Sequence, residues 1–567
     1  MKFSEMIYKR PDFETVKTEI RAKLEAFKTA KSADEQIKCL EAINVIRNNI
    51  DTQSELSNIR HSINNNDEFY SKENDYWDEY GPLYANETTN LAKAILASPF
   101  LDDLKKKYPK QLFALLENSV KSFDECIIED LQEENKLSTK YNRIRATAQI
   151  EFEGGTYTLP KLSVFLEDSD RNVRKRAEKA IVDFYTSHEQ EIDEIYDGLV
   201  KVRAKIAKKL GFKNFVELGY VRMNRNDYNA DDVACYRKQI LETVTPMAQK
   251  IVEEQRKRLG YDDMYSYDLE YKFVSGMPKP QGSPEWIVEN GRKMYSELSP
   301  ETKEFFTMMA DNELMDLVSK DGKEGGGYTT YITDYKSPFI FSNFNGTAGD
   351  LEVLTHEAGH AFQVYCSRDI TIPECMWPTY ESCEIHSMSM EFFTYPWMKN
   401  FFGPDTDKYL YNHLTGTVLF LPYGVLVDHY QHEVYEHPEM SPAERKATWR
   451  KLEKMYMPWK KYDGAEAELF ERGGWWYQQL HIFDMPFYYI DYTLAQVCAH
   501  QFFGKMNKDF NAAWKDYIHL CKLGGTQSFL GLVKETGLKS PFVEGTVAAA
   551  MQEVKAKIEE FSKGNIQ

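Results

Sequence analysis

The pentapeptide HEAGH at residues 356–360 constrains this chain more than any other stretch, because its histidines, His356 and His360, can act together only on a helix. Residues four apart on a helix project from one face, one turn apart, so both imidazoles can hold one zinc ion. Glu357 then lies beside the metal, where it can deprotonate a water molecule. In a chain of this composition, such a His-acidic-x-x-His pattern is expected by chance only about 0.04 times. The pentapeptide therefore predicts a zinc site that cleaves amide bonds.

The residues around the pentapeptide favour a helix that follows a strand. Thr347 and Asp350 have the spacing of an N-terminal helix cap. The run 338–344 is short, apolar and aromatic, as a buried strand beside a cleft would be, and a further strand is expected at 328–332. Apolar residues then recur at helical intervals, at Leu351, Leu354, Ala358, Ala361, Phe362 and Tyr365.

A catalytic zinc ion usually has three protein ligands and one open position, so a third ligand is expected downstream of His360. Glu374 follows a proline and is expected in a loop, whereas residues 380–394 suit a helix. On that helix Glu381, Glu384 and Glu391 share one face, and spacing alone leaves both Glu381 and Glu384 open. The other carboxylates are candidates to accept the second N–H of a metal-bound histidine. The full set of candidates is Glu374, Glu381, Glu384, His386 and Glu391.

Three segments together resemble the M3 family of thimet-type oligopeptidases, and most of all its oligoendopeptidase F and Pz-peptidase branch. They are residues 344–347, residues 356–361, and residues 384–387 followed by Glu391. In that family the third ligand is a glutamate with a serine three residues later and another glutamate seven residues later. Only Glu384 has Ser387 and Glu391 at those offsets.

The resemblance implies a complete metal site with its catalytic base. One Zn²⁺ ion per chain would be held by His356, His360 and Glu384. Glu357 would be the general base. Glu381 and Glu391 are left as supporting carboxylates.

The resemblance extends to residues 473–495, which are rich in tyrosine. In M3 enzymes such a segment faces the zinc, and matching without gaps places the two substrate-facing tyrosines at Tyr489 and Tyr492. The family's histidine falls one residue away from His481. Peptide hydrolysis needs a hydrogen-bond donor for the oxyanion of the tetrahedral intermediate, and a tyrosine hydroxyl or a histidine N–H is of the right type. Tyr492, Tyr489 and His481 are therefore the expected catalytic partners of Glu357, and the donor among them is left open.

At 567 residues the chain is too long for one simple core, so two or more lobes are expected. Residues 10–145 have helical periodicity, and residues 148–165 change to a hairpin pattern with a turn at Gly154-Gly155. We therefore predict an N-terminal helical region at 1–169 and a catalytic region at 170–567. The family resemblance implies a mainly α, two-lobed helical ellipsoid with a deep substrate channel and a small β-sheet beside the zinc site.

Overall charge and cysteine usage limit the partners and the compartment. The net charge is −19, from 70 basic and 89 acidic residues, which argues against binding to nucleic acids or anionic membranes. The eight cysteines are scattered without Cys-x-x-Cys pairs, as in a reducing compartment. Residues 1–13 contain no apolar run, and no stretch reaches the roughly 18 apolar residues that span a bilayer. We therefore expect a cytoplasmic protein.

The expected function is zinc-dependent hydrolysis of internal peptide bonds in short, unstructured oligopeptides, which the resemblance implies as substrates. A zinc aminopeptidase is one alternative, although such enzymes usually have a shorter gap than residues 361–383 between the second histidine and the glutamate. A non-catalytic peptide-binding protein is the other, and the complete set of two histidines and two glutamates argues against it. The oligomeric state is left open.

A second histidine-rich segment lies at residues 428–437, where His432 and His437 are five apart. On a helix, five residues turn the second side chain about 140° away from the first. His429 and His432 could share a face, but Pro438 ends the segment. We expect polar surface here rather than a second metal site.

Overall fold

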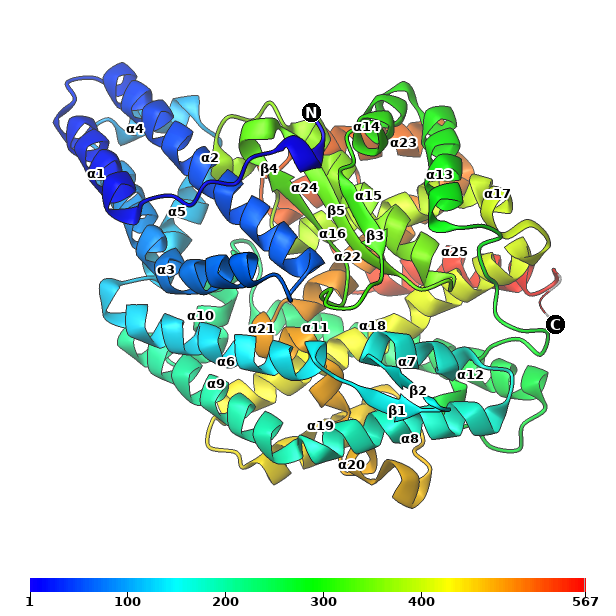
Figure 1. Cartoon of the computed structure of the whole chain (residues 1–567). Coiled ribbons are helices and arrows are strands. Elements are labelled where there is room, and N and C mark those ends of the chain that lie inside the picture. The colour runs from blue at the N-terminus through cyan, green and yellow to red at the C-terminus, as the bar shows by residue number, and fades with distance from the viewer. Residues whose placement is uncertain (565, 567) are drawn as a thin grey trace.

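The computed structural model describes residues 1–564 and 566. Within them helices dominate, and the strands form one two-stranded and one three-stranded sheet. Figure 1 shows the N-terminal helices, in blue, gathered at one side of the molecule. No helix in this part of the chain is long and apolar enough to cross a membrane. The prediction of a mainly α fold with a small sheet is confirmed.

The N-terminal helices have a hydrophobic cluster of their own. The three longest of them are capped at the N-terminal end by a side chain, as where Asp12 accepts a hydrogen bond from the N–H of Thr15. Ile372 and Cys375 join the cluster from the later part of the chain, so these helices are anchored against it. The helices are α1 (Phe13–Thr29), α2 (Ala33–Ile63), α3 (Glu68–Leu96), α4 (Leu101–Lys107) and α5 (Lys110–Ser122).

The hairpin predicted near residue 150 is present after α6 (Ile128–Ala146), but its turn lies one residue earlier than expected. Strand β1 (Ile150–Phe152) pairs antiparallel with β2 (Gly155–Tyr157), and Phe152 lies opposite Gly155. The turn residues are therefore Glu153 and Gly154, with φ of +47° and +80°. A two-residue turn with two positive φ angles matches the twist of a hairpin. The predicted Gly154-Gly155 turn is wrong because Gly155 belongs to the strand.

Long helices follow the hairpin. After α7 (Leu159–Ser163), α8 (Arg171–Ser187) lies along β1 and α9 (Glu189–Lys209) packs against α6, in the lower part of Figure 1. The chain then continues through α10 (Phe215–Arg222), α11 (Ala230–Gln239), α12 (Thr245–Leu259), α13 (Pro284–Leu298) and α14 (Pro300–Asp311).

The three-stranded sheet has the order β3-β5-β4. Strand β5 (Ser337–Phe344) is central and almost wholly buried; it runs parallel to β3 (Met315–Val318) and antiparallel to β4 (Tyr328–Ile332). Both strands predicted here, at 328–332 and 338–344, are confirmed. Because β4 lies at the edge of the sheet, one side of its backbone is not paired with another strand.

The helices after the sheet share the largest hydrophobic core with the helices α6–α14 that precede it. Helix α15 (Gly349–Ser367) packs on β5 and on α16 (Tyr380–Phe393), and α16 packs on α22 (Tyr489–Lys508). The others are α17 (Lys399–Phe402), α18 (Thr406–Glu436), α19 (Pro442–Tyr456), α20 (Glu468–Glu471), α21 (Leu480–Asp484), α23 (Phe510–Leu523), α24 (Phe529–Glu535) and α25 (Thr546–Phe561).

Two local predictions in this part of the chain are wrong. Thr347 does not cap α15; instead the Asp350 carboxylate accepts hydrogen bonds from the N–H groups of Asn345 and Gly346, at 2.8 and 2.9 Å, and so fixes the loop before the helix. The segment around His432 is not polar surface, because α18 carries it into the core. There the His432 side chain is buried and lies 3.0 Å from the Tyr220 hydroxyl.

Candidate active site

The crossing of α15 and α16 depends on a glycine. A Cβ atom at Gly359 would lie 2.6 Å from the Cα of Ser387 and 2.8 Å from the carbonyl oxygen of His386. Such distances are far shorter than van der Waals contact, so any larger residue would push the helices apart. The glycine of the HEAGH pentapeptide thus lets the backbone of α16 approach α15, which brings Glu384 to the two histidines.

His356, His360 and Glu384 form one compact cluster. The Oε2 atom of Glu384 lies 3.3 Å from the Nε2 atoms of both histidines. One ligand atom from each residue lies within 4.8 Å of the others, and no other cluster of metal-ligand type occurs in residues 1–564 and 566. Two imidazole nitrogens and a carboxylate oxygen, open to a cavity, are the donor set of a catalytic zinc site. The residues present therefore fit a zinc ion.

A network of hydrogen bonds orients His356. Glu391 lies 2.7 Å from Nδ1 of His356 and 2.6 Å from Nε2 of His413, and Tyr395 contacts the other nitrogen of His413 at 2.6 Å. Although burial opposes its charge, the hydrogen bonds to both histidines hold the pKa of Glu391 below its ordinary value. Such outer partners fix the tautomer and orientation of a ligating histidine.

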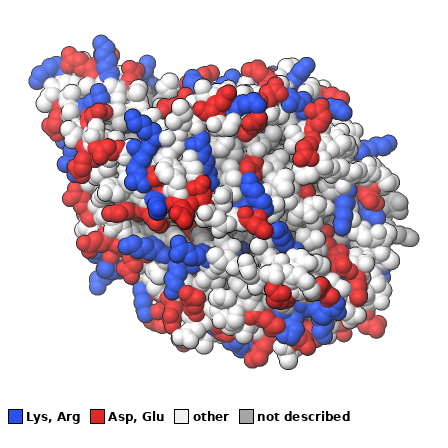
Figure 2. Space-filling view, in the orientation of Figure 1, with Lys and Arg blue, Asp and Glu red and all other residues white. Residues whose placement is uncertain are grey.

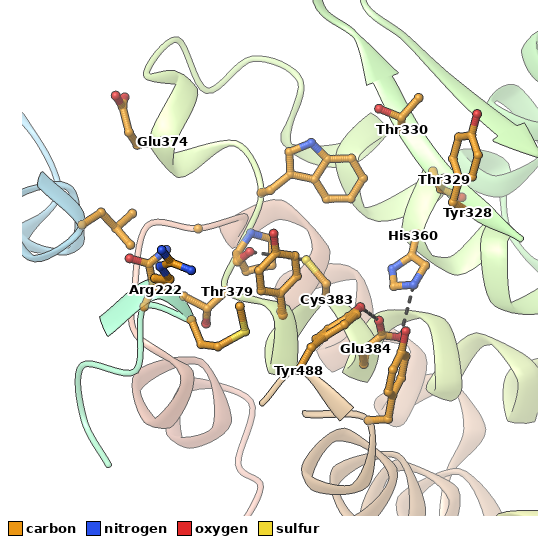
Figure 3. Close-up of a pocket in the computed structure, with 18 of the residues that line it drawn as sticks. Arg222, Tyr328, Thr329, Thr330, His360, Glu374, Thr379, Cys383, Glu384 and Tyr488 are labelled. Carbon is orange, nitrogen blue, oxygen red and sulfur yellow. Dashed lines mark hydrogen bonds and ion pairs between the residues drawn. The ribbon is translucent and has the colours of Figure 1, made fainter. Parts of the chain in front are cut away.

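The carboxylate of Glu384 is held by two hydroxyl groups. Ser387 donates to its Oε2 at 2.9 Å, and Tyr488 donates to its Oε1 at 2.5 Å. Figure 3 shows Tyr488 pointing at Glu384, with His360 next to it. His413, Tyr395 and Tyr488 are not predicted from the sequence. His413 comes from α18, Tyr395 from a short 3-10 turn after α16, and Tyr488 directly precedes α22, each at no fixed spacing from the pentapeptide.

Other candidate ligands lie outside the cluster. Glu374 pairs with Arg47 at 2.6 Å, and Figure 3 shows it well away from His360. His386 is fully buried and bonded to the carbonyl oxygen of Ser382. Glu381 is not a supporting carboxylate of the histidines; it is buried beside Asp491, and burial together with that like charge raises its pKa well above the usual range.

Glu357 faces the cavity beside the cluster. Its carboxylate accepts a hydrogen bond at 2.8 Å from Thr329, which lies on the edge strand β4. Burial raises the pKa of Glu357, even though His356 and His360 act in the opposite direction. A carboxylate whose pKa is shifted toward neutrality is better suited to accept and return a proton. Thr329, a partner not predicted from the sequence, therefore holds the candidate base in place.

The cluster opens into a cavity of about 860 Å³ that several parts of the chain enclose. The β4 residues Tyr328, Thr329 and Thr330 form one wall and the end of α10 at Arg222 another, as Figure 3 shows. Helix α5 contributes Gln111 and Leu115, so the N-terminal helices help to enclose the site.

The tyrosine-rich segment contributes three side chains to the cavity, and they are not quite those predicted. His481, Tyr488 and Tyr492 line it, with Nε2 of His481 3.2 Å from the Tyr492 hydroxyl. Tyr489 does not line the cavity. Its ring packs behind the cavity wall, against His481 and Tyr492 on one side and Phe420 and Tyr423 on the other. Tyr488 is the N-cap residue of α22 and has helical φ and ψ of −69° and −37°, so Tyr488 and Tyr492, four residues apart, share one face.

The hydroxyl groups of these tyrosines are protonated at neutral pH. Burial, and then the negative charge of Glu384, raise the pKa of both Tyr488 and Tyr492 well above the ordinary value. Burial also lowers the pKa of His481 to about 4, so its imidazole is neutral. Both tyrosines can therefore act as hydrogen-bond donors beside the metal cluster.

Charged side chains are mixed on the face seen in Figure 2. Lys and Arg side chains are interspersed there with Asp and Glu, and neither sign gathers into one large patch.

Comparison with known proteins gives one consistent result. Residues 3–123 match the Peptidase M3 N-terminal domain, and residues 164–552 match Peptidase family M3. Oligopeptidase PepF of Bacillus subtilis is 23% identical over 411 residues, 70% of this chain and 58% of that protein. An oligoendopeptidase F homolog of Borreliella burgdorferi is 25% identical over 72% of this chain and 68% of its own length.

A solved structure extends the likeness to the whole fold. Pz peptidase A, determined with an inhibitor, superposes with a TM-score of 0.97 at 52% identity, over 99% of both chains. The alignment with PepF spans less than two thirds of that relative, whereas this one is essentially complete. The chain belongs to peptidase family M3.

Proposed function

We propose that this protein is a zinc-dependent endopeptidase that hydrolyses internal peptide bonds of short, unstructured oligopeptides. The observation that carries the proposal is the convergence of His356, His360 and Glu384 in one cavity with Glu357. Membership of family M3 and the likeness to an oligopeptidase and to Pz peptidase A support it.

The metal is the first part of the proposal. His356, His360 and Glu384 would hold one Zn²⁺, which when bound polarises the scissile carbonyl and lowers the pKa of a water molecule. Glu391 keeps His356 oriented, and Ser387 and Tyr488 keep Glu384 oriented. Side chains held in this way need little rearrangement before they bind a cation.

The chain's own residues then move the protons. Glu357 takes a proton from the attacking water and returns it to the leaving nitrogen, while Thr329 keeps its carboxylate facing the cavity. Tyr492, beside His481, donates a hydrogen bond to the oxyanion of the tetrahedral intermediate. Tyr488 takes the place expected for Tyr489 as the second tyrosine of the site, because its hydroxyl donates a hydrogen bond to Glu384.

The edge of the sheet suggests how a substrate is held. β4 has a strand on one side only, and its residues 328–330 line the cavity. An extended peptide can pair with such an edge through its backbone, which recognises an unfolded chain without demanding particular side chains. A cavity of about 860 Å³ holds a short segment of extended chain and excludes a folded domain.

The proposal also covers the boundary between the two regions of the chain and the cellular compartment. We propose that residues 1–169 form the N-terminal region and 170–567 the catalytic region, with α5 of the first covering the cavity of the second. The eight cysteines are all free thiols, which supports a reducing, cytoplasmic environment.

A doubly blocked peptide tests the proposed function. We expect cleavage of a quenched fluorescent peptide that is acetylated at its N-terminus and amidated at its C-terminus. Cleavage should stop with a chelator and return with Zn²⁺. It should be far slower when the same peptide sequence is part of a folded protein. A requirement for a free N-terminal amine would instead indicate an aminopeptidase, and would contradict the proposal.

A further inference from the structure

The residue before Tyr488 has an unusual backbone conformation. Phe487 has φ of +70°, in the left-handed region that bulky side chains rarely adopt. Such a conformation is unfavourable and persists only where surrounding contacts impose it. It occurs directly before Tyr488, whose hydroxyl reaches the carboxylate of Glu384. The contacts that impose it therefore decide where Tyr488 points.

The first of these contacts is a buried arginine. The guanidinium group of Arg225 is fully buried, and one of its nitrogens, Nη2, donates both to the carbonyl oxygen of Phe487 and to Oδ1 of Asp491, the latter at 2.9 Å. Asp491 lies in the first turn of α22. Arg225 thus joins the residue before Tyr488 to the helix that follows it. On the other side, the N–H of Phe487 donates to the Gln431 side chain at 3.1 Å.

The second contact is the seat of the Phe487 ring. A Cβ atom at Gly219 would lie 2.5 Å from Cδ2 of Phe487, so the ring occupies space that only a glycine leaves free. The ring centroids of His432, Tyr435 and Tyr220 lie 5.1, 5.6 and 5.7 Å away. The ring of Phe487 therefore has one position, and its backbone has little freedom.

We propose that Arg225 and Gly219 are positioning residues for Tyr488: together they hold the left-handed turn at Phe487, which aims the Tyr488 hydroxyl at the metal ligand Glu384. The effect on catalysis rests on the proposed function, but the position of the Tyr488 hydroxyl can be tested without it. Neither residue lies in the metal cluster, and neither would touch the reacting atoms.

Two substitutions each remove one of the contacts that hold the turn at Phe487. Arg225→Lys keeps the charge but removes the planar guanidinium, and Gly219→Ala adds the one methyl group that the Phe487 ring cannot accommodate. The matched control is Arg237→Lys, because Arg237 is also buried and pairs with Asp428 at 2.5 Å but has no hydrogen bond to α22. Crystal structures of the three variants give the Tyr488–Glu384 distance independently of activity.

A kinetic cycle with Tyr488→Phe supplies the second readout. We expect Arg225→Lys and Gly219→Ala each to lower kcat about tenfold, with KM changed by less than about twofold, because a small displacement of an orienting group acts on the reaction more than on binding. In the Tyr488→Phe background the same substitutions should add almost nothing. Arg237→Lys should leave kcat within about twofold.

In the crystal structures, Tyr488 should leave Glu384 in the Arg225 and Gly219 variants and stay in the Arg237 variant. The proposal is overturned if Tyr488 keeps its contact in both test variants, or if their kinetic effects are the same with and without the Tyr488 hydroxyl. Should Arg225→Lys fail to fold, Gly219→Ala and Asp491→Asn carry the same comparison. If the wild-type protein cleaves no peptide, the proposed function fails, and the crystal structures still decide the positioning.

Discussion

The two halves of the site are built in different ways. The metal half takes its histidines and Glu384 from the middle of two regular helices, α15 and α16, which cross at Gly359. The tyrosine half takes its side chains from the short helix α21 and from the irregular start of α22, where Phe487 has a left-handed conformation.

The difference shows what fixes each half. In the metal half, helical periodicity and one glycine contact bring the ligands together. In the tyrosine half, the orientation of each ring depends on residues distant in sequence, such as Arg225 and Gly219. We therefore expect substitutions in the metal half to act through chemistry or helix packing, and those in the tyrosine half to depend on single contacts.

The largest expected effect is at Glu357. Glu357→Gln keeps the size of the side chain and removes its ability to take a proton, so kcat should fall by about 10³- to 10⁴-fold. Zinc content should not change, because Glu357 is not one of the clustered ligands. Steady-state kinetics and metal analysis of the purified variant measure both quantities.

Glu374 provides the control for that substitution. It also lines the cavity but pairs with Arg47, so Glu374→Gln should keep kcat within about threefold of wild type. Equal losses in the two variants would contradict the assignment of the base and erase the distinction between cavity lining and chemistry.

The tyrosine half gives the next effect. Removing the hydroxyl in Tyr492→Phe should lower kcat about 100-fold, because a lost oxyanion donor has an effect of that order. Tyr489→Phe should change it by less than about twofold, since Tyr489 packs against Phe420 and Tyr423 outside the cavity. Side-by-side kinetics on one peptide compare them; a larger loss at Tyr489 would restore the arrangement expected from the sequence.

The smallest effect concerns stability and sharpens the role of the helix crossing. Gly359→Ala should destabilise the protein by about 1–3 kcal/mol, because its methyl group meets the backbone of α16. Gly416→Ala, in helix α18 with nothing within 4 Å, should instead be neutral or stabilise by up to about 1 kcal/mol. Chemical denaturation measures both, and zinc affinity should fall only for Gly359→Ala. Equal stability of the two variants would show that the crossing tolerates a side chain.

The metal half of the site could be predicted from the sequence to a greater extent than the tyrosine half. The strands at 328–332 and 338–344 and the helix that carries His356 were predictable, because their apolar patterns are regular. Spacing left Glu381 and Glu384 open, and the family resemblance was needed to choose between them. The structure brings Glu384 to the histidines and leaves Glu381 beside Asp491.

The remainder depended on contacts between distant segments. The sequence predicts Tyr489 where the structure places Tyr488 in the cavity wall. The left-handed conformation of Phe487 cannot be anticipated from the local pattern. His413 and Thr329 reach the site from α18 and β4 with no fixed spacing. The burial of His432 likewise requires knowledge of its neighbour Tyr220, more than 200 residues earlier in the chain.

The central claim is that one divalent ion is bound between His356, His360 and Glu384. Anomalous diffraction from a crystal of the zinc-loaded protein, recorded on either side of the zinc absorption edge, tests it most directly. We expect one strong peak per chain within bonding distance of both Nε2 atoms and of the Glu384 carboxylate, and no such peak in His360→Ala. A peak elsewhere in the chain, or none in a protein that still cleaves peptides, would contradict the account.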